Sequence, residues 1–313
     1  MRAAVVREVG AVPEPGELPD PKPSDGEVLV EVHAGALNPI DIAIASGRFY
    51  AGPPHVPYAP GREGVGITAD GKRVRFERDV GYGANGSLAQ LIAVDEDALI
   101  PLPDEADDDV AAALGVAGLA AWLALEKAQV SGATVAVLGA TGAVGQVAVQ
   151  GAKVLGAARV VAAARNADAL ERTRELGADE TVALDEGDLG AALRDAAGGE
   201  IDAVIDPLWG APAVAALTTL KLGGRLVHLG TSAGLEATIP SAPLRGKNVS
   251  IIGHSNLTTP NDVKARAFRE LLDHVIAARI RVDVDVFPLD RVADAWREQA
   301  SSPHRKLVVR PTE

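Results

Sequence analysis

Residues 134–166 read TVAVLGATGAVGQVAVQGAKVLGAARVVAAARN, and this stretch decides the fold of the 313-residue chain. It predicts a short apolar strand over 134–138, a helix over 144–155 and a second apolar strand over 159–164. A glycine-containing turn joins the first strand to the helix. The order strand, turn, helix, strand is the βαβ unit from which parallel sheets are built.

The turn over 139–145 is suited to an anionic ligand. The three glycine positions of the dinucleotide-binding fingerprint G-x-G-x-x-G fall on Ala140, Gly142 and Gly145, so one glycine is replaced by alanine. Gly142 lets the backbone approach a ligand, and Gly145 lets the helix lie tightly on the strand. The helix N-terminus then offers free N–H groups to a diphosphate. The residues predicted to bind a dinucleotide here are Thr141, Gly142, Ala143, Val144 and Gly145.

The end of the second strand predicts which dinucleotide is preferred. NAD-selective sites carry Asp or Glu there for the ribose 2′-hydroxyl, whereas an Arg accommodates a 2′-phosphate. This chain has Ala164, Arg165 and Asn166 at that place and no carboxylate before Asp168. A charge-assisted contact with the phosphate contributes roughly 1.5–3 kcal/mol. We therefore predict NADP(H) as the cofactor, bound through residues 164–166. The alternative is that Arg165 is a solvated surface residue.

Strand and helix signals alternate from about residue 118 onward. Alternation at this spacing implies right-handed crossovers and a parallel, doubly wound sheet of the α/β class. The further strands expected are 181–184, 201–206, 225–229 and 249–252, and the further helices are 167–176, 189–197 and 211–220.

Two loops follow the later strands and extend the predicted cofactor site. Ligands of doubly wound sheets bind beyond the carboxyl ends of the strands. Gly230, Thr231 and Ser232 follow the strand 225–229, so we expect them to meet the nicotinamide ribose or carboxamide. His254 and Ser255 follow the strand 249–252 and either close the cleft or form an ordinary loop.

The two ends of the chain indicate a second domain. Residues 1 to about 105 favour β structure, with strands over 28–32 and 86–94 and a hairpin around Asp70-Gly71. The tail predicts a helix over 264–279, a strand over 284–287, a helix over 292–299 and a strand over 306–309. We infer a discontinuous catalytic domain, 1–118 and 259–313, into which a nucleotide-binding domain, 119–258, is inserted.

The composition excludes several classes of function. A net charge of −13 without a basic stripe argues against nucleic acid as a partner. The chain has no cysteine, which excludes disulfides, thiolate catalysis and Cys-ligated zinc. The apolar run 110–125 is shorter than a membrane span, so we interpret it as a buried helix of a cytoplasmic protein without a membrane segment.

The whole chain resembles the zinc-independent quinone oxidoreductases of the medium-chain dehydrogenase/reductase (alcohol dehydrogenase-like) superfamily. The matching segments occur in family order and cover nearly the whole sequence. They are GALNPID at 35–41, PGREGVG at 60–66, the acidic start and Ala-rich run at 104–125, the glycine turn at 139–145, LGAD at 176–179 and RKLVV at 305–309.

The resemblance implies a GroES-like β-rich catalytic domain and a Rossmann nucleotide-binding domain. It also implies metal-free transfer of hydride from NADPH to a quinone or to a conjugated carbonyl. Zinc-dependent relatives place a metal-binding Cys where this chain has Asn38 and a His where it has Arg62, so no metal site is expected. Family members commonly form homodimers near the strand matching 249–252, and we expect a homodimer.

The reaction predicts a small set of catalytic candidates. The nicotinamide must lie about 3–3.5 Å from an electrophilic carbon, and the acceptor oxygen needs a hydrogen-bond donor. Asn38 is the candidate donor or carboxamide holder, against a role as a turn-stabilising residue before Pro39. Tyr50 lies close to where related enoyl reductases carry a proton-donating Tyr, and a structural Tyr is the alternative.

Three functions remain open at this point. The first is an NADPH-dependent quinone reductase, and the second is an enoyl or enone reductase that differs only in the acceptor. The third is a non-enzymatic NADPH-binding sensor that keeps the fold. The sequence does not separate the first two functions, because the choice of acceptor depends on the shape of the substrate pocket.

Overall fold

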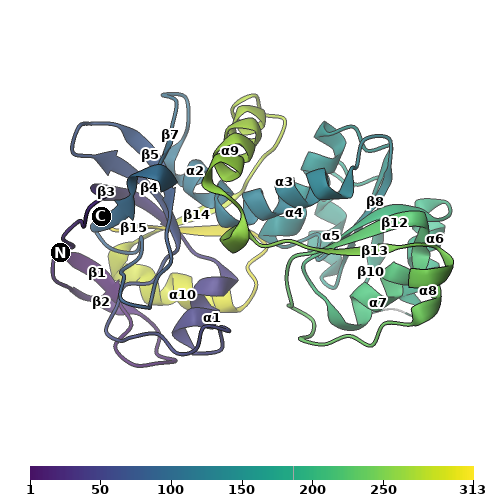
Figure 1. The fold of residues 1–313 in the computed structure, drawn as a ribbon, viewed down its shortest axis with the longest axis horizontal. Coiled ribbons are helices and arrows are strands. Elements are labelled where there is room, and N and C mark those ends of the chain that lie inside the picture. The colour runs from purple at the N-terminus through teal and green to yellow at the C-terminus, as the bar shows by residue number, and fades with distance from the viewer. Residues whose placement is uncertain (186) are drawn as a thin grey trace. The chain divides into compact units, whose positions relative to one another are not determined.

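Two units are described by the computed structural model, which covers residues 1–185 and 187–313 (Figure 1). The β-rich unit consists of Met1–Val116, Asn261–Leu272 and Val282–Glu313. The parallel-sheet unit consists of Ala117–Pro260 and Asp273–Arg281. Along the chain, the second unit therefore interrupts the first.

The parallel-sheet unit is built on six parallel strands in the order β10-β9-β8-β11-β12-β13. From β8 the chain adds strands in one direction, and from β11 it adds them in the other. This confirms the predicted doubly wound sheet and places its switch point between β8 and β11. The strands are β8 (Thr134–Leu138), β9 (Arg159–Ala164), β10 (Glu180–Ala183), β11 (Ile201–Asp206), β12 (Leu220–His228) and β13 (Ser250–Gly253).

Helices cover both faces of this sheet. On one face, Leu193, Leu217 and Leu244 pack in a single apolar cluster with Leu226 of β12. Figure 1 shows α7 and α8 on the opposite side of the strands from α4. The helices are α3 (Val116–Ala128), α4 (Ala143–Val154), α5 (Ala167–Arg172), α6 (Leu189–Ala197), α7 (Gly210–Thr219) and α8 (Ser241–Gly246).

Local chemistry sets the ends of these helices. The side chain of Asn166 accepts a hydrogen bond from Ala169 N at 2.8 Å and caps α5. Asp188 caps α6 in the same way, and α6 ends at Gly198, whose φ of +72° suits glycine. The helix predicted over 167–176 ends earlier, at Arg172, and continues as turns.

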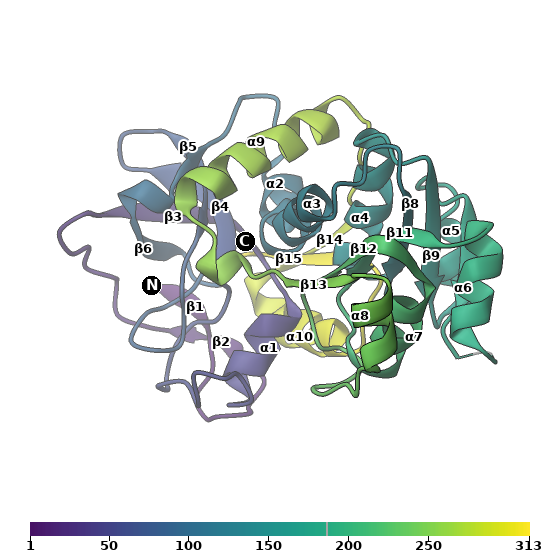
Figure 2. The same ribbon diagram turned by 45° about the vertical axis from the view of Figure 1, so that its right-hand side comes forward.

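The β-rich unit is organised around β3, which pairs with β4, β6 and β15. The C-terminal strand thereby joins the N-terminal strands in one sheet, and α10 packs against β14 and β15 (Figure 2). The predicted hairpin is confirmed as β4 and β5. The strands are β1 (Arg2–Val5), β2 (Glu14–Glu17), β3 (Glu27–Ala36), β4 (Glu63–Thr68), β5 (Arg73–Glu77), β6 (Leu91–Asp95), β7 (Ile100–Pro101), β14 (Val284–Pro288) and β15 (Lys306–Arg310). The helices are α1 (Pro39–Ala45), α2 (Asp108–Leu114), α9 (Asn261–Ile276) and α10 (Val292–Ala300); the end of α9 belongs to the other unit.

The predicted strand over 86–94 begins only at Leu91. Gly86 and Ser87 bond to a loop, whereas Leu88 and Gln90 bond to β1 without forming a continuous strand. Gly86 N donates to Ala59 O at 2.7 Å, and Ser87 N donates to Gly61 O at 2.8 Å. These non-local partners take the backbone groups that a sheet would have used.

The apolar run over 110–125 is not one helix, because it breaks at Gly115 between α2 and α3. A side chain at Gly115 would collide with the carboxylate of Glu63. The same carboxylate accepts a hydrogen bond from the backbone N–H of Val116. The break therefore gives Glu63 access to a helix N–H. In the described part of the chain no single helix is both long and apolar enough to cross a membrane, and only the bent pair α2 and α3 reaches that length and composition together.

Candidate cofactor and active site

The turn after β8 takes its shape from Gly139 rather than from residue 140. Gly139 has a φ of +60°, in the left-handed region that favours glycine. Ala140 donates its N–H to Ala163 O at 3.1 Å, and its methyl group is fully buried. The residue that must adopt a positive φ is therefore Gly139, one position before the first glycine of the fingerprint. This explains how the chain tolerates alanine at the first fingerprint position.

Gly142 and Gly145 are glycines for different reasons. A Cβ at Gly145 would lie 2.5 Å from the Cα of Ala140, so α4 packs on the turn only without a side chain there. A Cβ at Gly142 would meet only the carbonyl oxygen of Gly139, at 3.5 Å, which is an ordinary contact. Nothing within the protein requires glycine at 142. The open space beside it fits the close approach of a diphosphate.

The starts of α4 and α7 lie beside the switch point and differ in the turn that precedes them. Helix α4 begins at Ala143, and the preceding Gly142 has no side chain to cap it. At the start of α7, the carboxylate of Asp206 accepts hydrogen bonds from Leu208 N and Trp209 N, both at 2.9 Å. Asp206 therefore holds the turn that leads into α7. The start of α4 remains the place where the sequence predicts an external anion.

Of residues 164–166 at the end of β9, two have structural roles and one has a side chain that could bind a ligand. Ala164 is buried at the end of the strand, and Asn166 uses its side-chain oxygen to cap α5. Arg165 is exposed, and its guanidinium has no hydrogen bond or ion pair with any residue in the described ranges. Arg165 is therefore the one member of the predicted trio with a side chain ready for a ligand.

The predicted residues after β12 lie against the loop after β11. A Cβ at Gly230 would lie 2.6 Å from Pro207 O, so the two loops require glycine at this contact. Ser232 N donates to the same Pro207 oxygen at 3.3 Å. The side chains of Thr231 and Ser232 are exposed beside this contact. Both loops lie at the carboxyl edge of the sheet, on the side of the switch point opposite Arg165.

His254 and Ser255 follow β13 at the same edge. Burial and the nearby Lys127 lower the pKa of His254 to about 4, so its ring is neutral at pH 7. His254 Nε2 lies 3.0 Å from Asn256 Oδ1, and its Nδ1 is buried without a partner. Ser255 uses its hydroxyl to accept a bond from Leu257 N at 3.2 Å. Only His254 retains an unused polar atom.

Asp206, His228 and Trp209 are not among the sequence-predicted site residues, yet they meet at this edge. Asp206 is the last residue of β11, and His228 is the last residue of β12 directly beside it. Asp206 Oδ2 lies 3.2 Å from His228 Nδ1, and the rings of His228 and Trp209 are in contact, with centroids 4.3 Å apart and planes tilted by 40°. A sequence signal was present, because polar residues at the ends of adjacent parallel strands meet at one edge.

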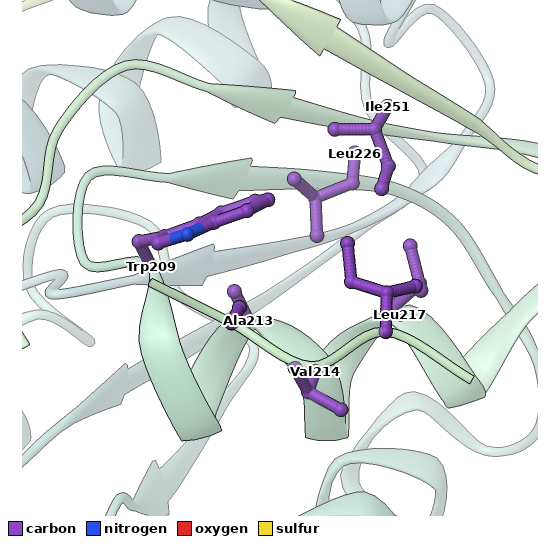
Figure 3. A pocket seen from close by; sticks show the side chains of 8 residues that line it. Trp209, Ala213, Val214, Leu217, Leu226 and Ile251 are labelled. Atoms are coloured by element: carbon purple, nitrogen blue, oxygen red, sulfur yellow. The ribbon is translucent and has the colours of Figure 1, made fainter. Parts of the chain in front are cut away.

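A small apolar pocket lies beneath Trp209 (Figure 3). Its lining comes from α7, β12, β13 and the segment 237–239, and the indole of Trp209 lies at one end. It contains about 170 Å³ of empty space, part of it open to solvent, and this space is too narrow for a water molecule. The pocket is therefore a packing defect under the site rather than a place for the cofactor. The lining residues are Trp209, Ala213, Val214, Leu217, Leu226, Ala237, Ile239 and Ile251.

In the β-rich unit, the amide of Asn38 is held by the protein itself. Asn38 Nδ2 donates to Glu63 Oε1 at 2.6 Å, and Asn38 Oδ1 accepts from Lys306 Nζ at 2.7 Å. Lys306 Nζ also donates to Leu37 O at 3.0 Å and lies 3.2 Å from Glu63 Oε1. All three polar side chains are buried. Asn38 therefore has a fixed orientation, and its strongest donor is engaged with Glu63 rather than directed at a ligand.

Asp41 and Arg62 fix the backbone around this network. Asp41 accepts from Asn38 N at 2.8 Å and from Arg62 N at 3.1 Å. Burial raises the pKa of Asp41 to about 6. The guanidinium of Arg62 points to Glu77 and Asp79, and these two carboxylates raise its pKa against the effect of burial. Arg62, at the position of a metal-binding His in zinc relatives, is thus a cation already paired with carboxylates.

Tyr50 is the most exposed of the predicted catalytic residues, with 81% of its surface accessible. Its ring packs against Phe49 with centroids 4.1 Å apart, and its hydroxyl has no partner among the described residues. The hydroxyl is free to donate a proton, but burial does nothing to orient it. In the same described ranges, no group of three or more His, Asp or Glu side chains is arranged to hold a metal ion.

Two family patterns match the chain. The pattern "Alcohol dehydrogenase GroES-like domain" matches residues 24–104, and the pattern "Zinc-binding dehydrogenase" matches residues 143–274. The first falls within the β-rich unit, and the second covers most of the six-stranded sheet.

Individual relatives extend these matches over the whole chain. Quinone oxidoreductase-like protein 2 of Bos taurus is 30% identical over 284 residues, which are 86% of this chain and 80% of the bovine protein. Alcohol dehydrogenase of Geobacillus stearothermophilus is 28% identical over 95% of each chain. The quinone oxidoreductase of Thermus thermophilus, solved also in complex with NADPH, is 33% identical with a TM-score of 0.85, covering 99% of this chain and 100% of that chain.

Proposed function

This chain belongs to the medium-chain dehydrogenase/reductase superfamily, in its quinone oxidoreductase branch, and from that premise we propose that it transfers hydride from NADPH to a quinone without a metal. The chain is an oxidoreductase of this superfamily. The proposal concerns which coenzyme it uses, which acceptor it reduces and how it does so.

The observation that carries the coenzyme proposal is the open start of α4. Gly142 leaves space above the turn and has no side chain to cap the helix, and the exposed Arg165 follows the neighbouring strand. A diphosphate fits the open turn, and a 2′-phosphate fits the free guanidinium. The Thermus thermophilus relative, which is solved with NADPH, supports the same choice.

The chain's own groups have three tasks in this reaction. Bound NADPH supplies the hydride, and the start of α4 together with Arg165 holds its phosphates. Reduction of a quinone to the neutral hydroquinone adds one hydride and one proton, so the proton must come from the protein or from water. The exposed hydroxyl of Tyr50 is the candidate donor. Asn38, fixed by Glu63 and Lys306, shapes the backbone of its loop.

Two positions support a mechanism without zinc. Asn38 is bonded on both sides of its amide, and Arg62 is paired with Glu77 and Asp79. An amide in that state is a poor metal ligand, and a guanidinium repels a cation. The cysteine-free sequence offers no thiolate to replace them.

A steady-state assay tests the acceptor. The protein is given NADPH with either 1,4-benzoquinone or 2-cyclohexenone, and oxidation of NADPH is followed by the loss of its near-ultraviolet absorbance. Faster turnover of the quinone supports the proposal. Turnover of the enone alone would make the chain an enone reductase, a function favoured by the free hydroxyl of Tyr50. Tight NADPH binding without turnover of any electrophile would indicate a coenzyme-binding sensor instead.

We also propose that the protein is a homodimer. Strand β13 ends the parallel sheet, so one side of its backbone has no strand partner in the described residues. Such an edge is a ready template for pairing with a second copy. Sedimentation equilibrium checks this, and a single species with the mass of one 32.1 kDa chain would contradict it.

A further inference from the structure

The pair formed by Asp206 and His228 has no role in the function proposed above, although it lies at the edge of the sheet where that function needs ligand contacts. Asp206 is fully buried, and its carboxylate accepts bonds from two backbone N–H groups and from His228 Nδ1. Because a carboxylate only accepts, Nδ1 carries the hydrogen. Asp206 therefore fixes both the tautomer and the orientation of the ring.

The other ring nitrogen of His228 is available. Nε2 has no hydrogen bond within residues 1–185 and 187–313. It is not one of the buried polar atoms that lack a partner, so it is open to solvent. A quarter of the side chain is exposed. The indole of Trp209 lies against the ring at a tilt of 40°. His228 is thus an oriented ring with one accessible polar atom, in contact with Trp209 and hydrogen-bonded through Nδ1 to Asp206.

The place of His228 in the sheet points to one half of a dinucleotide. The two mononucleotide halves of such a ligand lie over the two halves of a doubly wound sheet, on either side of the switch point. Arg165 follows β9 in the first half, and His228 ends β12 in the second. Gly230, two residues further on, is pressed against the loop that Asp206 holds. His228 therefore lies where the second ribose is expected.

We propose that His228, oriented by Asp206, is a binding residue for the nicotinamide half of the coenzyme, with Nε2 in a hydrogen bond to a ribose hydroxyl. A hydroxyl both donates and accepts, so it pairs with the neutral ring and with the protonated ring. This inference rests on the proposed coenzyme function. It adds a contact that NADPH and NADH share, whereas the contact of Arg165 belongs to NADPH alone.

Binding measurements on the full chain test this without relying on turnover. Isothermal titration calorimetry at fixed pH and salt gives the dissociation constants of NADPH, NADH and 2′,5′-ADP, which contains only the adenosine half. His228→Asn keeps a side-chain group near Asp206 but has no atom in the place of Nε2. His228→Gln reaches the place of Nε2. His33→Asn is the matched control, because His33 makes a similar contact with Asp108, at 2.8 Å, in the β-rich unit.

The expected result separates the two halves of the ligand. His228→Asn should weaken the binding of NADPH and of NADH by a similar factor, roughly 3- to 10-fold. The dissociation constant of 2′,5′-ADP should stay within about twofold of the wild-type value. His228→Gln should recover part of the loss, and His33→Asn should change nothing. The proposal is overturned if His228→Asn binds both coenzymes like the wild type, if 2′,5′-ADP weakens equally, or if His228→Gln binds worse than His228→Asn. Failure of the wild type to bind either coenzyme would instead refute the proposed function itself.

Discussion

Gly145 packs directly against Ala140, and a methyl group at position 145 would lie 2.5 Å from the α-carbon of Ala140. Gly142, three residues earlier, has no such neighbour, since a methyl group there would meet only Gly139 O at 3.5 Å. The same turn therefore contains one glycine that the fold requires and one that the fold does not require. Substitution separates the two roles.

Gly145→Ala and Gly142→Ala should have opposite effects on folding and binding. Gly145→Ala forces α4 away from the turn, and we expect a loss of roughly 1–3 kcal/mol in the free energy of unfolding, measured with urea. Gly142→Ala should leave that free energy within about 0.5 kcal/mol, because its backbone angles suit any residue. Its NADPH affinity should nevertheless fall at least about tenfold, since the methyl group occupies the space of the diphosphate. Unchanged affinity in Gly142→Ala would show that the diphosphate lies elsewhere.

Arg165→Ala should change coenzyme preference rather than coenzyme binding in general. Loss of a charge-assisted contact with the 2′-phosphate should weaken NADPH binding by roughly 10- to 100-fold. NADH binding should weaken by less than about threefold. Arg245→Ala is the control for the change in net charge, because Arg245 is exposed on α8, which precedes the amino end of β13. Equal losses for NADPH and NADH would mean that Arg165 does not contact the 2′-phosphate. Fluorescence titration with both coenzymes provides the measurement.

Much of the parallel-sheet unit could be predicted because its signals are local. Strands β8, β9 and β11 and helix α6 have the bounds expected from the sequence. Each of these strands is an almost unbroken apolar run, as strands buried on both faces are, and glycine or polar turns bound them. The place of the glycine turn and of Arg165 followed from the same pattern. The exposed state of Arg165 agrees with a binding role, which stays a prediction.

The network around Asn38 could not be predicted, because its partners are remote in the sequence. Glu63 lies on β4, and Lys306 lies on the C-terminal strand that joins β3. The break at Gly115 has the same origin, since Glu63 rather than any local signal decides it. Periodicity reports which face of an element is buried, but it contains no information on which buried polar groups meet. The sequence therefore predicts a site role for Asn38, but it does not show that the amide is already bonded.

Lys306→Met should strongly destabilise the protein. The change leaves the buried carboxylate of Glu63 without its ammonium partner and leaves Asn38 Oδ1 without a donor. Breaking a buried charge pair in this way costs about 3–5 kcal/mol. The double variant Glu63→Gln/Lys306→Met removes both charges and should recover at least about 1 kcal/mol of that loss. Urea unfolding of the two single variants and the double variant gives the coupling, and simple additivity would contradict a direct interaction.

The free energy of unfolding of the wild type, relative to that of Asp41→Asn, should be larger at about pH 4 than at about pH 7. Burial raises the pKa of Asp41 from 3.8 to about 6, so the folded state binds its proton more tightly than the unfolded state does. The resulting stability is fully present below about pH 4 and is lost as the pH rises through 6, which amounts to about 3 kcal/mol. Asp108 and Asp179, whose pKa values are lowered, act in the opposite direction, but they contribute equally to both proteins. The difference in unfolding free energy between wild type and Asp41→Asn, measured from about pH 4 to about pH 7, should therefore fall steadily and then level off. A difference independent of pH would mean that Asp41 is ionised throughout and that its two backbone hydrogen bonds outweigh its burial.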